Sequence, residues 1–347
     1  MLRILDANLN RVGEGLRVLE DVSRFILNDP SLSEELKTLR HQLLPNDRSI
    51  QEKLLRARKA GEDVGAFVGQ ESEAERPDTL SLVRANSRRV QQSLRVIEEV
   101  TKVPGQDFGL DWKKVKEARF RLYQLEQSML LGLGRRDRAR RVAGLYLIID
   151  VQLLQGRSEA EVARAAIRGG ARLVQLRDKM RPKREVVAAA RRLKSVCAES
   201  GAMFIMNDYL DVALVSDADG LHVGQDDLPV LDARRLVPAD RLVGCSAATV
   251  EEAVQAEEQG ADYVAVGAMY PTPTKPGTRI AGLGVLRQVK AKVSVPVVAI
   301  GGINEHNVTE VMGAGADAVA LISAVLNATD IEEASRRLAA RIGGGQK

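Results

Sequence analysis

The chain has 347 residues, 45% of them hydrophobic and 28% charged, a composition typical of a soluble globular protein, and its length suggests two domains at roughly 150 residues each. The net charge of +4 is small for this length, so no nucleic-acid-binding surface is predicted. Residues 1–10 lack the apolar core of a signal peptide, and no apolar run approaches the roughly 18 residues that span a membrane. We therefore expect a cytoplasmic protein that binds neither nucleic acid nor a membrane.

Residues 1–134 are dominated by helical periodicity, and one segment recurs. Residues 7–22 align with residues 85–100 at a constant offset. Both copies place apolar side chains on one helical face: Val12, Leu16 and Leu19 in the first copy, and Val90, Leu94 and Ile97 in the second. Each copy is followed by another amphipathic segment, residues 36–43 and 115–122. This pattern predicts an all-α domain of two helical hairpins that bury their apolar stripes against each other.

Residues 135–142 are strongly basic, with five arginines in the seven residues from Arg135 to Arg141. Such a run could contact nucleic acid, but an isolated run of charge is more often a solvated helix end or a linker. No adjacent aromatic residues are available to stack on bases. We therefore predict that residues 135–142 form a linker.

Residues 143–347 alternate short apolar strands with amphipathic helices. Eight segments read as buried strands: residues 144–149, 173–176, 203–206, 220–223, 242–244, 263–266, 297–300 and 318–321. Helical segments such as 184–199 and 250–259 lie between them. Eight strand–helix units in about 200 residues predict a (β/α)8 TIM barrel, an α/β fold, at the lower end of its size range. The alternative is a doubly wound open sheet, but its Gly-rich dinucleotide fingerprint is absent.

Acidic residues follow the third and fourth predicted strands. Because the carboxyl ends of barrel strands meet at one mouth, Asp208 and Asp227 are expected to lie there together. Cations from neighbouring strand ends are Arg177, Lys179 and Lys275. Asp219 and Asp226 are nearby acids, and a lone Asp after a strand is usually a turn residue. Two carboxylates with few other ligands suit Mg²⁺, whereas no His or Cys cluster favours zinc.

Small and hydroxyl residues follow the last two predicted strands. Gly301 and Gly302 come after the seventh strand, and Ser323 comes after the eighth. The glycines could form only a tight turn, but the corresponding loops of barrels commonly bind phosphate through backbone N–H groups. Together with the cations elsewhere in the mouth they predict two anion sites. Two anion sites in one mouth imply a reaction between two phosphorylated molecules.

Six motifs in a fixed order identify the family that residues 143–340 resemble. They are Gln-Leu-Arg-x-Lys from Gln175, Asn-Asp from Asn207, His-x-Gly-Gln-x-Asp from His222, Gly-x-Ser from Gly244, Pro-Thr-x-Thr-Lys from Pro271 and Gly-Gly-Ile from Gly301. This segment closely resembles thiamine-phosphate synthase, also called thiamine-phosphate pyrophosphorylase. The resemblance implies that the barrel joins 4-amino-2-methyl-5-hydroxymethylpyrimidine diphosphate to 4-methyl-5-(2-phosphoethyl)thiazole with the help of Mg²⁺. The products would be thiamine phosphate and pyrophosphate.

The same resemblance implies roles for individual residues. The pyrimidine diphosphate is assigned to Gln175, Arg177, Lys179 and Asn207, and its diphosphate end also to Ser246 and Lys275. The thiazole phosphate is assigned to Thr272, Thr274, Gly302, Ile322 and Ser323. Mg²⁺ is assigned to Asp208 and Asp227 rather than to Asp226, a choice that spacing alone leaves open.

The implied reaction needs no protein nucleophile, because the thiazole nitrogen attacks the cation that forms as pyrophosphate departs. Lys179, Ser246 and Lys275 are therefore expected as the catalytic residues, with Arg177 and Mg²⁺ sharing the charge of the leaving group. His222 is expected to be structural. Two other interpretations remain. One is a thiazole tautomerase on the same barrel, which the paired acids and lysines disfavour, and the other is a non-catalytic regulatory barrel.

Residues 1–130 resemble a small domain fused to some thiamine-phosphate synthases and associated with phosphorylating the pyrimidine monophosphate. Four polar residues recur between the two copies: Asn8 as Asn86, Arg11 as Arg89, Arg17 as Arg95 and Glu20 as Glu98. They predict either a phosphate-binding seam or, more simply, surface ion pairs on a domain that only mediates association. The domain lacks the Gly-x-x-x-x-Gly-Lys-Ser/Thr loop of familiar kinases. The sequence leaves this activity open, and also the oligomeric state, with a homo-oligomer as one expectation.

Overall fold

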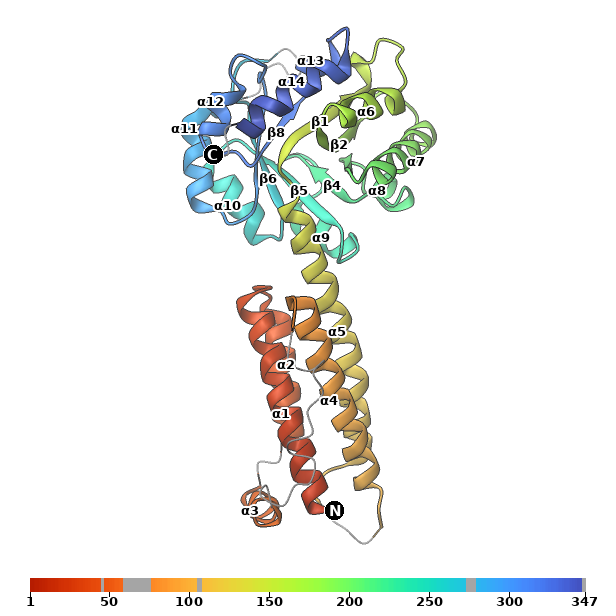
Figure 1. Cartoon of the computed structure of the whole chain (residues 1–347), viewed down its shortest axis with the longest axis vertical. Helices are drawn as coiled ribbons and strands as arrows, with labels where there is room; N and C mark the ends of the chain where they lie inside the picture. Colours follow the sequence, from red (N-terminus) through yellow and green to blue (C-terminus); the bar gives the residue numbers. More distant parts are fainter. Residues whose placement is uncertain (45–46, 59–75, 105–107, 273–278, 345–347) are drawn as a thin grey trace. The chain divides into compact units, whose positions relative to one another are not determined.

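A computed structural model describes residues 1–44, 47–58, 76–104, 108–272 and 279–344. The chain divides into two compact units, residues 1–134 and residues 135–347 (Figure 1). We call them the helical unit and the barrel unit. No helix in the described ranges is long and apolar enough to cross a membrane.

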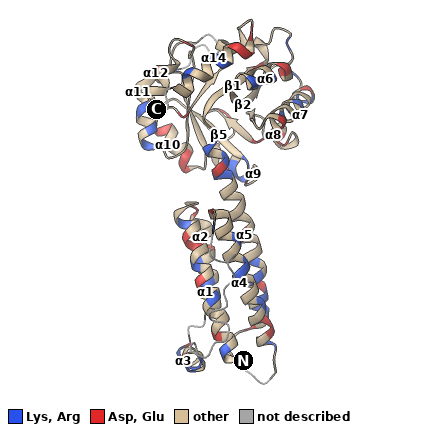
Figure 2. Cartoon of the chain, in the orientation of Figure 1, with Lys and Arg blue, Asp and Glu red and all other residues tan. Residues whose placement is uncertain are grey.

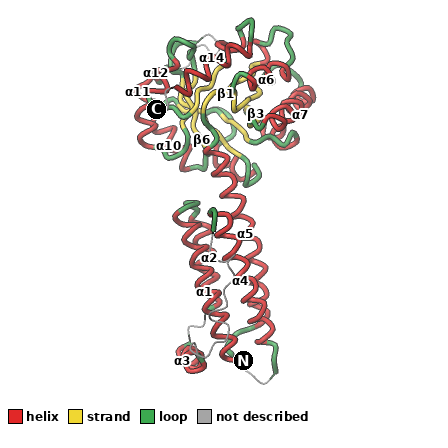
Figure 3. The backbone as a smooth tube through the Cα atoms, viewed as in Figure 1, coloured by secondary structure: helices red, strands yellow, loops and turns green. Residues whose placement is uncertain are grey.

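The helical unit contains helices and no strand within its described residues (Figure 3). Its helices are α1 (Leu2–Phe25), α2 (Pro30–Leu43), α3 (Arg48–Ala57), α4 (Thr79–Thr101) and α5 (Trp112–Arg140), the last of which continues into the barrel unit. Asp29 caps α2 by accepting a 3.0 Å hydrogen bond from the Leu32 N–H, and Asp78 caps α4 in the same way. Basic and acidic residues are interspersed along α1, α4 and α5 (Figure 2), as is typical of solvated helix faces.

The predicted repeat lies in α1 and α4, whose apolar stripes form the core of the helical unit. The stripe residues belong to one buried cluster and are at most 1% exposed: Val12, Leu16, Leu19, Val90, Leu94 and Ile97. Gly15 allows α1 and α4 to approach closely, because a Cβ at this position would lie 2.4 Å from Cγ2 of Val90. The predicted burial of one stripe against the other is confirmed.

The recurring glutamates are buried, so the expectation of simple surface ion pairs is wrong for their carboxylates. Glu20 is 4% exposed and Glu98 is 2% exposed. Each accepts a hydrogen bond from one arginine of its own helix and one of the next helix in the hairpin: Glu20 from Arg17 and Arg40, and Glu98 from Arg95 and Arg119. The repeat therefore preserves a carboxylate that joins the two helices of each hairpin.

The basic run that we expected to be a linker is helical as far as Arg140. Arg135 forms a 3.2 Å ion pair with Asp262, and Arg138 donates a hydrogen bond to the backbone oxygen of Asp240. These partners belong to the barrel unit, as the run itself does. The run is thus a helix end bound to the barrel rather than a free connection.

Eight parallel strands close into a barrel in sequence order, with β1 paired to both β2 and β8 (Figure 1). The strands are β1 (Gly144–Asp150), β2 (Ala171–Arg177), β3 (Met203–Asn207), β4 (Gly220–Val223), β5 (Leu242–Ala247), β6 (Tyr263–Gly267), β7 (Val297–Ile300) and β8 (Ala318–Leu321). The helices of the unit are α6 (Glu159–Arg168), α7 (Lys183–Ser200), α8 (Leu210–Val215), α9 (Val230–Leu236), α10 (Val250–Glu258), α11 (Gly282–Lys292), α12 (Val308–Gly313), α13 (Ser323–Leu326) and α14 (Ile331–Gly344). The predicted TIM barrel is confirmed, and closure rules out the open sheet.

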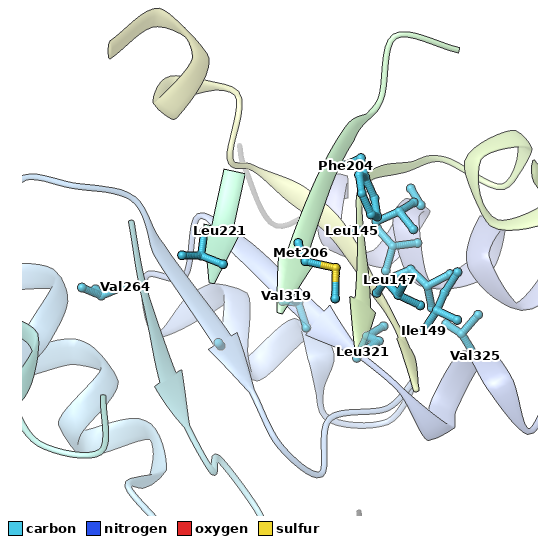
Figure 4. Close-up of a cluster of buried hydrophobic side chains, with 14 of the residues drawn as sticks. Leu145, Leu147, Ile149, Phe204, Met206, Leu221, Val264, Val319, Leu321 and Val325 are labelled. Carbon is cyan, nitrogen blue, oxygen red and sulfur yellow. The ribbon is translucent and has the colours of Figure 1, made fainter. Parts of the chain in front are cut away.

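Side chains along the barrel strands alternate between two buried layers. On β1, Leu145, Leu147 and Ile149 belong to the cluster between the strands and the outer helices (Figure 4). Tyr146 and Ile148, between them in sequence, belong to the cluster inside the barrel. Burial on both faces explains why β1 reads as an uninterrupted apolar run rather than an alternating one.

Candidate active site

A cavity of about 290 Å³ lies at the carboxyl ends of the strands. Every described residue of the predicted site lines it: Gln175, Arg177, Lys179, Asn207, Asp208, Asp227, Ser246, Thr272, Gly302, Ile322 and Ser323. Thr274 and Lys275 lie outside the described residues. The barrel topology thus gathers residues that are distant in sequence, while their individual roles stay predictions.

The end of β2 supplies two cations to the cavity. Arg177 is the last residue of β2, and its Nη1 lies 2.5 Å from Oδ2 of Asp150 at the end of β1. Asp150 is only 3% exposed, so this ion pair fixes the guanidinium against the neighbouring strand. Lys179 follows β2, and its Nζ lies 3.0 Å from Oδ2 of Asp208.

Two carboxylates meet where β3 and β4 end. Asp208 directly follows β3 and has a φ of 61°, a left-handed conformation that is uncommon for residues other than glycine. The N–H of Gly224 donates a 2.9 Å hydrogen bond to Oδ2 of Asp227. Burial of Asp208 and its contact with Asp227 raise the pKa of Asp208 above its usual value, and Lys179 offsets only part of this effect. A cation bound by both carboxylates would relieve the repulsion between them.

This carboxylate pair fits Mg²⁺. Mg²⁺ prefers oxygen ligands, keeps several of its waters and usually takes one or two carboxylates from the protein. Among the described residues, no group of three or more His, Cys, Asp or Glu side chains could hold a metal ion. Asp208 and Asp227 would therefore need further oxygens from water and substrate, which suits Mg²⁺ better than zinc.

Ser246 on β5 contacts a buried imidazole on β4. Its Oγ lies 3.0 Å from Nε2 of His222, and the Nδ1 of the same ring lies 3.1 Å from the hydroxyl of Tyr263. Burial lowers the pKa of His222 to about 4, although the charge of Asp227 acts in the opposite direction. The ring is therefore neutral near pH 7, in keeping with the structural role expected for it.

The loops after β6, β7 and β8 bring backbone and hydroxyl groups to the cavity. Gly302 has a φ of 68°, and a Cβ there would lie 2.8 Å from the backbone oxygen of Pro271. Glycine is needed at this position for both reasons. Thr272 and Ser323 also line this part of the site. Hydroxyl and N–H donors of this kind bind phosphate oxygens.

Several residues of the site were not predicted from the sequence. Asp150 carried a usable signal, because it is an acid at a strand end like Asp208, but the predicted strand stopped one residue before it. Glu252 lines the cavity and accepts a 2.6 Å hydrogen bond from the Ala248 N–H, yet in the sequence it is one of several acids on a helix. Tyr263 begins an apolar strand and gave no sign of a polar contact.

Both units match known protein families. The thiamine monophosphate synthase family matches residues 145–325, and the ThiD2 family matches residues 3–128. A thiamine-phosphate synthase of Thermosynechococcus vestitus is 41% identical over 347 residues, which cover 99% of this chain and 95% of the relative. The chain belongs to the thiamine-phosphate synthase family. The family resemblance read from the barrel motifs is thereby confirmed.

Other members of the family match only part of this chain. The thiamine-phosphate synthase of Methanospirillum hungatei is 49% identical over 197 residues, which make up 56% of this chain and 96% of the relative. A solved structure of thiamine phosphate pyrophosphorylase from Pyrococcus furiosus is 38% identical with a TM-score of 0.56, and the match covers 60% of this chain and 99% of that one. These relatives are about as long as the barrel unit alone, so the family includes members of one unit and of two.

Proposed function

We propose that the barrel unit condenses 4-amino-2-methyl-5-hydroxymethylpyrimidine diphosphate with 4-methyl-5-(2-phosphoethyl)thiazole, giving thiamine phosphate and pyrophosphate. The proposal is carried by the cavity, which is lined by the cations Arg177 and Lys179 and by the carboxylates Asp208 and Asp227. The chain that forms it is related over nearly its full length to thiamine-phosphate synthases. The thiazole nitrogen donates an electron pair to form the new C–N bond. The electron pair of the breaking C–O bond leaves with pyrophosphate, so no protein nucleophile is needed.

In this proposal the cations stabilise the leaving group. Arg177 and Lys179 bind the diphosphate oxygens, which gain negative charge as the C–O bond breaks. Asp150 keeps Arg177 at the cavity wall. Asp208 and Asp227 would hold Mg²⁺, which would supply further positive charge to the diphosphate. Lys275, assigned to the same task, lies outside the described residues.

The thiazole phosphate occupies the other loops. Thr272, Gly302 and Ser323 bind its phosphate through hydroxyl and backbone N–H groups. Thr274 is assigned to the same phosphate and also lies outside the described residues. Holding both substrates in one cavity aligns the nitrogen with the reacting carbon, which is the main contribution left to the protein once the leaving group is stabilised.

The test is product formation by the intact purified chain. With both substrates and Mg²⁺, thiamine phosphate and pyrophosphate should appear in equal amounts, and omission of either substrate should abolish both. A thiazole tautomerase would isomerise a thiazole phosphate without releasing pyrophosphate, and a regulatory barrel would turn over neither substrate. Absence of both products from the complete mixture would overturn the proposal.

We infer a second activity for the helical unit, the phosphorylation of the pyrimidine monophosphate to the diphosphate. The observation that favours it is the match of residues 3–128 to the ThiD2 family in a chain whose barrel would consume the diphosphate. Each repeated asparagine uses one of its two amide N–H groups within its own helix, Asn8 on the Ile4 oxygen and Asn86 on the Leu82 oxygen.

An inactive barrel separates the two activities in one chain. Asp208→Asn should allow the pyrimidine diphosphate to accumulate from ATP, Mg²⁺ and the monophosphate, whereas the unchanged chain with thiazole phosphate should carry it on to thiamine phosphate. No diphosphate from either protein would refute the kinase proposal without affecting the barrel proposal. A cytoplasmic location and a homo-oligomeric state stay predictions from the sequence.

A further inference from the structure

A chain of hydrogen bonds runs through the barrel interior from Gln175 to Ser246. Nε2 of Gln175 donates to the Tyr146 hydroxyl at 2.7 Å, and that hydroxyl lies 3.1 Å from the hydroxyl of Tyr263. The Tyr263 hydroxyl lies 3.1 Å from Nδ1 of His222, whose Nε2 lies 3.0 Å from Oγ of Ser246. The chain joins five strands, and both of its ends line the cavity.

The middle of this series of hydrogen bonds is buried. Tyr146 and Tyr263 are at most 1% exposed, and His222 is 7% exposed. Buried polar groups need partners inside the protein, so each of these groups depends on its neighbours in the chain. Burial also raises the pKa of both tyrosines, and both hydroxyls therefore keep their protons near neutral pH.

Because each hydroxyl has one proton and a neutral imidazole has one N–H, the donation from Gln175 to Tyr146 sets the direction of every other hydrogen bond in this series. Since the Tyr146 hydroxyl accepts from Gln175, its own proton goes to Tyr263. The Tyr263 proton then goes to Nδ1 of His222. The ring proton of His222 must lie on Nε2, from which it is donated to the Ser246 hydroxyl.

We propose that Tyr146, Tyr263 and His222 are positioning residues that fix the hydrogen-bonding direction of Gln175 and Ser246 at the cavity. Gln175 directs an N–H to Tyr146, which leaves its Oε1 as an acceptor. Ser246 accepts from His222, which leaves its O–H as a donor. The cavity thus offers one acceptor and one donor of fixed direction.

The acceptor of Gln175 complements an aminopyrimidine, because the ring presents an amino donor, and the donor of Ser246 complements the diphosphate oxygens assigned to it. The inference rests on the proposed function for the identity of that ligand. A pyrimidine with a carbonyl in place of the amino group would meet the acceptor of Gln175 with another acceptor, which leaves both groups unpaired. The buried chain therefore selects the amino form.

The first test reads the tautomer of His222 directly and needs no turnover. The chain has three histidines, His41, His222 and His306, so ¹⁵N-histidine labelling of the intact protein gives few signals, and His222→Gln assigns the one that matters. Long-range proton–nitrogen correlations should show the proton of His222 on Nε2. A proton on Nδ1 would overturn the proposed direction, even if the barrel makes thiamine phosphate.

The second test interrupts this series of hydrogen bonds at one hydroxyl or the other. Tyr263→Phe and Tyr146→Phe each remove one hydroxyl and keep the ring, and each should raise KM for the pyrimidine diphosphate roughly three- to tenfold, the range for one misdirected hydrogen bond. The KM for the thiazole phosphate should stay unchanged. The double variant should lose no more than about the larger single loss, because both changes break one chain.

Tyr123→Phe, an exposed tyrosine of the helical unit, is the matched control and should change neither KM. Equal rises in both KM values, or no rise in either, would overturn the positioning role. If Tyr263→Phe does not fold, the tautomer measurement on the unchanged protein still decides the proposal. If the unchanged protein makes no thiamine phosphate, the proposed function fails, while the tautomer result stands separately.

Discussion

Among single residues, Asp208 combines two opposite effects: its ionised carboxylate is proposed to bind a cation, but it lowers the stability of the folded protein. Its carboxyl is largely buried beside Asp227, and both features raise its pKa. A carboxyl whose pKa is raised by folding contributes stability below the pKa of the unfolded chain and loses it as the pH rises through the folded pKa. Ionised Asp208 therefore costs folding free energy near neutral pH, and a bound cation would offset that cost.

Asp208→Asn should raise the free energy of unfolding near pH 7 and lower kcat by roughly 10² to 10³, the usual effect of removing one electrostatic group. Asparagine is suited to the left-handed φ of 61° at this position. Urea unfolding and steady-state assays with Mg²⁺ measure the two effects. Asp226→Asn, an exposed neighbour at the cavity rim, is the control and should change both quantities little. Equal losses of activity in the two variants would contradict the metal assignment.

Asp150 offers a test of how Arg177 is held. Asp150→Asn keeps the acceptor for the Gln152 N–H but removes the charge that faces the guanidinium. We expect kcat/KM for the pyrimidine diphosphate to fall roughly 10- to 100-fold, because hydrogen bonds to charged groups contribute about 1.5–3 kcal/mol. Asp211→Asn, which removes an exposed pair with Lys183, is the matched control. Unchanged kinetics in Asp150→Asn would show that Arg177 needs no partner.

For helices and strands, the sequence predicted the features that depend on the local pattern of residues. It did not predict the features that depend on contacts between residues far apart in the chain. Eight apolar runs predicted eight strands, because both faces of barrel strands are buried. The run from Arg135 could not be recognised as a bound helix end, because its partner Asp262 is far along the chain. Glu20 was expected at the surface for the same reason. Arg40, whose hydrogen bond stabilises the buried carboxylate of Glu20, comes from another helix.

The cavity residues divide in the same way into those that the local pattern predicted and those that depend on distant partners. Asp208 and Lys179 were predicted because strand ends meet at a barrel mouth. The hydrogen-bond chain through Tyr146 and Tyr263 was not, because an apolar strand gives no information about which hydroxyl will find a partner on a strand across the barrel. Which polar side chains meet inside the barrel can be predicted only when the register of the strands is known.

Glu98 is the buried carboxylate that joins α4 to α5. Desolvation raises its pKa, but hydrogen bonds from Lys102 and Arg119 outweigh this and hold the pKa at about 2. A carboxyl whose pKa is lowered by folding adds stability above its unfolded pKa and loses it as the pH falls through the folded value. This contribution is therefore fully present at pH 7 and is lost as the pH falls from about 4.5 toward about 2.

Glu98→Gln should destabilise the helical unit by roughly 1.5–3 kcal/mol at pH 7, the range for hydrogen bonds to a charged group. The difference from the unchanged protein should shrink as the pH falls toward 2. Glu99→Gln removes a neighbouring carboxylate whose side chain is 52% exposed, and it should change stability by less than about 1 kcal/mol. Denaturant titrations across this pH range measure both variants, and equal effects would contradict a special role for the buried carboxylate.

At the scale of the whole molecule, the chain has separate cores. The buried cluster of the helical unit shares no residue with the two clusters of the barrel unit. Units with separate cores tend to unfold separately, so a single two-state transition is not expected for the intact chain. Ligands stabilise only the unit that binds them.

Calorimetry of the intact protein should therefore show two transitions that respond to different changes. Mg²⁺ with pyrophosphate should raise the midpoint of one transition only, because a ligand at 100 times its Kd adds about 2.7 kcal/mol to the folded state that binds it. Glu98→Gln should lower the midpoint of the other transition only. If one transition responded to both changes, the helix α5 that passes from one unit into the other would couple the two cores into one cooperative structure.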